Sequence, residues 1–171
     1  MKFNTDGYLE AGLHDMAFDE IVEHFVTAFP TSNTRANIID GYKKHSNEIS
    51  KIGINCTEFI DGSFSTNKAD PADIDMVGFM DLDEVDALSP AEQEKLKLLF
   101  AGKATQATYM VDAYFVPTVP PTHPAFNQLR TQRKYWMGEF GYDREDRPKG
   151  IIRTEVSPEP VSTLSGDTED A

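Results

Sequence analysis

Cysteine is almost absent from this sequence, since Cys56 is the only one among 171 residues. A single cysteine excludes an internal disulfide framework and favours a reducing compartment. The sequence also lacks an apolar run long enough to cross a membrane, and its N-terminus has no basic segment followed by an apolar one. We therefore expect a cytoplasmic protein without a secretory signal or a membrane partner, with Cys56 as a small core residue.

Positive charge is also scarce. The chain has 16 Lys and Arg against 29 Asp and Glu, which gives a formal net charge of −13. Such a surface does not favour tight, non-specific binding to a long nucleic acid. A small nucleotide that carries its own metal ion, or a protein acceptor, is the more natural partner.

The pattern of apolar residues and of Gly and Pro divides the chain into a folded part and a tail. Residues 1–156 read as one α+β domain, a small mixed sheet packed by helices, whereas the Ser, Pro, Asp and Glu of 157–171 predict a disordered acidic tail. Residues 3–16 read as irregular and 81–86 as a solvated acidic turn. The expected helices are 17–29, 33–50, one that Ser89 caps and Gly102 ends, and 124–138; the expected strands are 54–61, 73–80, 106–116 and 150–156.

Three acidic residues stand out because they occupy strand-like, apolar surroundings. Asp73 and Asp75 are two residues apart, so on a strand they face the same side, and Asp112 lies inside the apolar run 107–116. Ionised carboxylates in such positions are costly, and three of them together would repel one another. A divalent cation removes this repulsion, and hard oxygen ligands with open positions suit Mg²⁺ or Mn²⁺.

A structural interpretation of the same residues remains open at this point. Asp73 follows Pro71 and would then cap a turn, Asp75 would guard an edge strand against aggregation, and Asp112 would be a core carboxylate whose hydrogen bonds are satisfied.

The acids lie in a wider pattern that resembles the nucleotidyltransferase superfamily named after DNA polymerase beta. Its signature is an apolar strand that ends in Gly-Ser, a spacer, Asp-x-Asp, and one more acid on a later strand. Here these parts are Phe59 to Ser63, Asp73 to Val77, and Tyr109 to Phe115, and the resemblance covers about residues 54–117. The sequences Asp61 to Phe64, Tyr142 to Arg144 and Arg147 to Ile151 also look like a bacterial group of short nucleotidyltransferase-like proteins.

This resemblance implies a two-metal reaction that moves a nucleotidyl group from a nucleoside triphosphate to a hydroxyl group. Asp73 and Asp75 would hold the metal that carries the triphosphate. Asp112 would help to bind the catalytic metal and would take the acceptor proton. All three aspartates are therefore expected to be catalytic residues and metal ligands.

The resemblance also implies a nucleotide-binding turn. Gly62 would let the backbone approach a phosphate, and Ser63 would donate its hydroxyl and N–H groups to a phosphate oxygen. Lys68, in the loop between the two halves of the motif, is a candidate phosphate ligand, although a solvated loop lysine is the simpler interpretation.

The shortness of the chain leaves little room for a separate helical domain that grips a nucleic-acid acceptor. It therefore resembles the minimal nucleotidyltransferases of toxin–antitoxin modules, some of which transfer adenylyl groups from ATP onto a protein hydroxyl. Two alternatives stay open: a catalytically inactive binding module of this fold, such as an antitoxin or a regulatory subunit, and a plain interaction protein.

Overall fold

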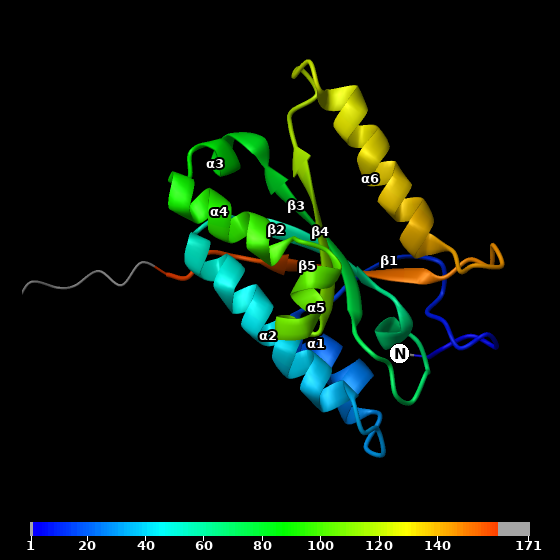
Figure 1. The fold of residues 1–171 in the computed structure, drawn as a ribbon. Helices are drawn as coiled ribbons and strands as arrows, with labels where there is room; N and C mark the ends of the chain where they lie inside the picture. The colour runs from blue at the N-terminus through cyan, green and yellow to red at the C-terminus, as the bar shows by residue number, and fades with distance from the viewer. Residues whose placement is uncertain (1, 161–171) are drawn as a thin grey trace, which may run out of the picture.

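The computed structural model describes residues 2–160, and its architecture is one five-stranded mixed sheet with helices on both faces (Figure 1). The strand order is β1-β5-β2-β3-β4. Strand β2 is antiparallel to both β3 and β5, while β3–β4 and β1–β5 are parallel pairs. The strands are β1 Gly12–Asp15, β2 Cys56–Asp61, β3 Ile74–Asp81, β4 Val111–Thr118 and β5 Gly150–Val156. The expected α+β class with a small mixed sheet is confirmed.

The helices divide unequally between the two faces of the sheet. Apolar clusters join α1, α2 and α4 to one face, whereas α6 covers the other face, and Figure 1 shows α6 standing apart from the rest. The helical elements are α1 Phe18–Val22, a π-helical turn Glu23–Thr27, α2 Arg35–Ile52, a 3₁₀ turn Ser63–Ser65, α3 Leu82–Asp86, α4 Pro90–Leu99, α5 Lys103–Tyr109 and α6 Phe126–Gly141. No helix in residues 2–160 is long and apolar enough to span a membrane.

Several expected boundaries are confirmed by the local chemistry that predicted them. Gly53 ends α2 in the left-handed conformation, with φ 88°. Ser89 and Glu92 form a capping box at the start of α4, with Pro90 at its first position. Cys56 is fully buried, as expected for a core residue.

Three expectations were wrong. Residues 12–15 form the edge strand β1, because they pair with β5, which lies far away in the sequence. The acidic segment after β3 is the short helix α3, whose N–H groups at Asp83 and Glu84 are capped by the Asp81 carboxylate. The strand expected at 106–116 begins only at Val111, and Gly102 precedes helix α5 instead of ending α4.

The error at α5 has a clear physical cause. A short apolar run does not distinguish a helix from a strand, and Tyr109 and Met110 continue directly into the apolar start of β4. Met110 separates the two elements by adopting the left-handed conformation, with φ 56°. Helix α5 packs so closely on α2 that a Cβ atom on Gly41 would lie 2.2 Å from the carbonyl oxygen of Tyr109.

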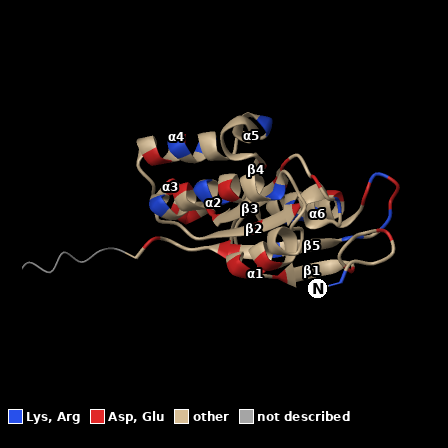
Figure 2. Ribbon diagram, turned by 90° about the horizontal axis from the view of Figure 1, so that it is seen from below, with Lys and Arg blue, Asp and Glu red and all other residues tan. Residues whose placement is uncertain are grey.

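Most of the predicted tail lies outside the described residues. Residues 157–160 have no regular structure, and they return toward the C-terminal part of α2. There Ser50 donates its hydroxyl to the Ser157 carbonyl at 2.7 Å and accepts the N–H of Glu159 at 3.2 Å through its own carbonyl. Figure 2 shows acidic and basic residues interspersed over the helices and in the loop between α6 and β5.

Candidate active site

The register of the sheet places three aspartates in a row across three adjacent strands. Asp61 on β2 pairs with Asp75 on β3, and Asp75 pairs with Asp112 on β4. Paired residues of neighbouring strands point to the same face, so the three carboxylates share one face of the sheet. The same face carries Phe59 and Val77, which pack with Phe140 of α6 in one apolar cluster. The opposite face is apolar and packs against α1 and α2.

Asp73 joins this group from outside the strand, because β3 begins at Ile74. Its Oδ2 accepts a hydrogen bond from the side-chain amide of Gln106 on α5. Burial, followed by the charge of Asp112, raises the pKa of Asp73. The structure thus brings Asp73, Asp75 and Asp112 to the same end of the sheet, as expected, and it adds Asp61, to which the sequence analysis gave no role.

Asp75 is the electrostatic centre of the row. Burial is the main cause that raises its pKa to about 6, and the charges of Asp73, Asp61 and Asp112 act in the same direction. A carboxylate surrounded by like charges is stabilised by protons or by cations, and a cation is the ligand it can share with its neighbours.

Asp61 has a cation of its own. Lys149, which precedes β5, donates to Asp61 Oδ2 at 2.7 Å, and the side chains of the pair are only 12% and 5% exposed. Burial still raises the pKa of Asp61 to about 6, against the lowering effect of Lys149. This ion pair explains why Asp61 is tolerated beside the other three aspartates.

Gly62 is required for a reason that the sequence did not show. Its φ is +81°, and a Cβ atom there would lie 2.2 Å from Asp75 Oδ2. The glycine therefore leaves space for the Asp75 carboxylate, in addition to any space for a ligand. Ser63 follows as the first residue of the 3₁₀ turn, and its carbonyl accepts the Thr66 hydroxyl at 2.8 Å.

One buried arginine fixes the turn and loop that follow Gly62 by donating hydrogen bonds to their carbonyls. Arg35 at the start of α2 is fully buried and donates to four backbone carbonyls: those of Phe25, Phe64, Thr66 and Lys68. Three of these carbonyls belong to the loop between the halves of the motif. The side chain of Lys68 is exposed and contributes to lowering the pKa of Asp73, so it lies near the acids but does not line the pocket beside them.

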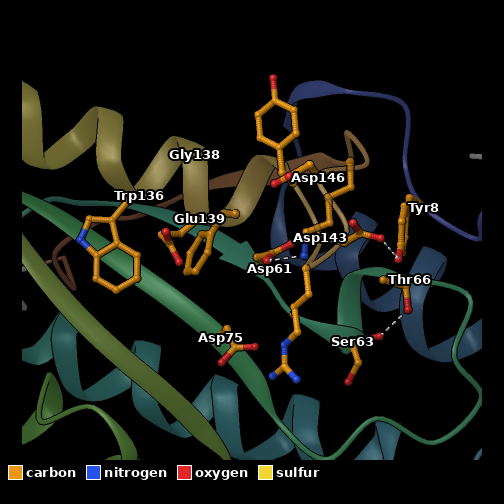
Figure 3. A pocket seen from close by; sticks show the side chains of 15 residues that line it. Tyr8, Asp61, Ser63, Thr66, Asp75, Trp136, Gly138, Glu139, Asp143 and Asp146 are labelled. Carbon is orange, nitrogen blue, oxygen red and sulfur yellow. Dashed lines mark hydrogen bonds and ion pairs between the residues drawn. The ribbon is translucent and has the colours of Figure 1, made fainter.

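A polar pocket of about 720 Å³ opens beside the row. Figure 3 shows Asp61, Asp75 and Ser63 on its sheet side, Trp136 and Glu139 reaching down from α6, and Tyr8 and Asp143 at its far end. Such a volume is typical of a small-molecule site, and the Gly62–Ser63 turn forms part of its wall.

Two of the aspartates fit a divalent cation. Asp112 is 8% exposed, and its Oδ1 has no hydrogen-bond partner among the described residues, while Asp75 lies opposite it in register. Mg²⁺ is commonly held by one or two carboxylates, with substrate phosphates and water filling the other positions. In residues 2–160 no three His, Cys, Asp or Glu side chains are gathered as a group for an ion. A site with all three predicted ligands therefore stays a prediction.

The structural interpretation of the acids fails at two points. Strand β3 lies between β2 and β4, so Asp75 is not on an edge strand. Asp112 is not fully satisfied, because one of its buried oxygens lacks a partner within residues 2–160.

Comparison with known proteins identifies the family through nearly the whole chain. A family of unknown function, DUF6932, matches residues 1–155. The chain belongs to DUF6932. No curated protein and no solved structure matches the chain. The match to DUF6932 spans every element that builds the pocket, from Tyr8 to Lys149.

Proposed function

We propose that this protein is a metal-dependent nucleotidyltransferase that moves a nucleotidyl group from a nucleoside triphosphate to a hydroxyl group of a protein or a small molecule. The observation that carries the proposal is the placement of Asp75 between Asp61 and Asp112, beside the Gly62–Ser63 turn and at the edge of a 720 Å³ pocket. The Gly-Ser turn and the aspartates of the motif are thus close together in space as well as ordered along the sequence.

Asp75 and Asp112 would hold Mg²⁺ or Mn²⁺, which would supply positive charge to the phosphates and to the attacking oxygen. The roles of the chain's own groups follow from their positions. Ser63 lines the pocket and offers a hydroxyl donor to a phosphate oxygen. Asp73, which lies outside the pair that would hold the cation and whose pKa is raised by burial and by the charge of Asp112, would suit an acceptor for the proton of the attacking hydroxyl.

One observation favours the alternative of a binding module without catalysis. Lys149 already neutralises Asp61, so part of the negative charge of the row is compensated by the protein itself. A module of this kind would bind a nucleotide without needing a divalent metal.

The two functions separate in a thermal melting experiment with each of the four nucleoside triphosphates, with and without Mg²⁺ or Mn²⁺. Ligand at a hundred times its Kd adds about 2.7 kcal/mol, or roughly 5–10 °C for a domain of this size. We expect a metal-dependent rise in the wild type that is lost in Asp75→Asn, together with loss of pyrophosphate release from the triphosphate. Asp40→Asn, an exposed position on α2, is the matched control and should behave as the wild type.

The outcomes are distinct. A rise that persists in EDTA supports the binding module. No rise with any triphosphate, or an undiminished metal-dependent rise in Asp75→Asn, contradicts the proposed transferase.

A further inference from the structure

The loop between α6 and β5 forms one wall of the pocket and is tightly organised. Asp143 is its centre: Oδ1 accepts the N–H groups of Glu145 and Arg147, both at 2.9 Å. Its Oδ2 accepts the Arg147 side chain at 2.7 Å and the hydroxyl of Tyr8 at 2.8 Å. Asp146 completes the turn in the left-handed conformation, with φ 60°. Four hydrogen bonds to one carboxylate give this loop a fixed shape.

The N-terminal segment holds this loop beside the Gly62–Ser63 turn. Tyr8 contacts Asp143 through its hydroxyl and forms a β-bridge with Thr66, which follows the Gly62–Ser63 turn. Three segments far apart in the sequence therefore meet at the pocket, and Figure 3 shows Tyr8, Thr66 and Asp143 together at its far end.

The two arginines of this loop differ in their partners. Arg147 is engaged in ion pairs with Asp6, Asp143 and Glu145. Arg144 lines the pocket, and it takes part in none of the ion pairs and side-chain hydrogen bonds within residues 2–160. Arg144 is exposed, and within residues 2–160 it is the positively charged side chain of the pocket lining that has no anionic partner, which suits it to bind an anionic ligand.

We propose that Arg144 binds the terminal phosphates of a polyphosphate ligand, with Lys149 supplying a second positive charge at the base of the same loop. This rests on the proposed function and extends it, because both residues lie outside residues 54–117, which carry the Gly-Ser and aspartate motif, and neither received a role there. The pocket then has two chemical sides. On one side, Asp75 and Asp112 would bind the metal ion. On the loop, Arg144 would bind the phosphate charge that the metal ion does not neutralise. Lys68, which does not line the pocket, is replaced in this role by Arg144.

The test uses inorganic tripolyphosphate with Mg²⁺ as the probe, measured by calorimetry on the full chain. Removing a charge-assisted hydrogen bond typically weakens binding by about ten- to a hundredfold. We expect such a loss in Arg144→Gln and partial recovery in Arg144→Lys, which keeps the charge but not the fork of donors. Arg130→Gln, an exposed arginine on α6 outside this pocket, is the control and should bind as the wild type.

The transferase assay distinguishes this inference from the proposed function. Loss of tripolyphosphate binding in Arg144→Gln in a protein that transfers no nucleotidyl group supports the phosphate site and overturns the transferase. Transfer by Arg144→Gln with unchanged KM, or tripolyphosphate binding within twofold of the wild type, overturns the phosphate site and leaves the transferase standing. Absence of tripolyphosphate binding in the wild type also overturns the phosphate site.

Discussion

Arg35 is a buried charged group and Asp75 a half-buried one, and both lie against the segment that begins at Gly62. Arg35 is completely buried, yet its guanidinium meets four carbonyl oxygens and lies 3.8 Å above the ring of Phe29. Burial lowers its pKa only to about 10, so it stays charged at neutral pH. Asp75 has the opposite surroundings, since three other carboxylates raise its pKa together with burial.

The difference separates a charge that builds the fold from a charge that awaits a ligand. A buried charge such as Arg35, whose Nη1 and Nη2 groups donate to four carbonyls while its Nε has no partner within residues 2–160, stabilises the conformation around it. A half-buried charge among like charges, such as Asp75, costs stability until a proton or a cation binds to it. The fold thus uses Arg35 to fix the loop that carries Ser63, and it keeps Asp75 in an unfavourable state close to that loop.

Removing the satisfied charge should have the largest effect on stability. Arg35→Met leaves four buried or half-buried carbonyls without their donor, and each such group costs about 1–3 kcal/mol. We expect the free energy of unfolding to fall by roughly 3–5 kcal/mol, measured by urea denaturation. Arg130→Met, at an exposed position, should change it by less than about 0.5 kcal/mol. A loss in Arg35→Met no larger than in this control would refute the structural role of Arg35.

Lys149 tests the intermediate case, a buried charge with one partner. Lys149→Met leaves the Asp61 carboxylate, 5% exposed, without its cation, and we expect a loss of about 2–4 kcal/mol at pH 8. The loss should shrink toward pH 5, because Asp61, whose pKa burial raises to about 6, then becomes protonated. The double variant Asp61→Asn with Lys149→Met should recover most of the stability. Additive losses in this double-mutant cycle would contradict the pairing.

The sequence predicted the parts of the fold whose signals are local. The capping box at Ser89, the left-handed Gly53 and the apolar stripe of α2 are read within a few residues of the chain. Strand β1 and helix α5 escaped because distant partners decide their conformation. Leu13 becomes a strand residue by pairing with Ile151, and helix α5 packs on α2, where Gly41 meets the carbonyl of Tyr109.

The candidate site was half visible in the sequence. The spacing of Asp73, Asp75 and Asp112 predicted that they meet, and they do lie at one end of the sheet. Asp61 was part of the quoted motif but received no role, although its place in the strand put it on the opposite face from Ile60 and on the same face as Asp75. Arg144 was part of a quoted resemblance but received no role, because its place in the pocket comes from a wall that only the folded loop creates.

Among the three variants, Asp75→Asn should give the smallest change in the free energy of unfolding, and the change should have a specific dependence on pH. The unfolded chain releases the Asp75 proton near pH 3.8, the ordinary value for an aspartate, whereas the folded protein keeps it until about pH 6. Between these values the folded state binds more protons, so the contribution of Asp75 to stability falls as pH rises and is constant above about pH 6. Asp75→Asn should therefore exceed the wild type by roughly 2–3 kcal/mol at pH 8 and by almost nothing at pH 4.

The buried acid Glu58 also has a raised pKa, but it is common to both proteins and cancels in the difference between the two unfolding curves. That difference reports Asp75 together with its repulsion of Asp61, Asp73 and Asp112. The control Asp40→Asn, far from the row, should show a difference that does not change with pH. Saturating Mg²⁺ should then reduce the difference in the free energy of unfolding between Asp75→Asn and the wild type at pH 8. The reason is that a cation between Asp75 and Asp112 stabilises only the protein that has both carboxylates. If Mg²⁺ leaves this difference unchanged, Asp75 is not a metal ligand, and its raised pKa belongs to a proton-binding site instead.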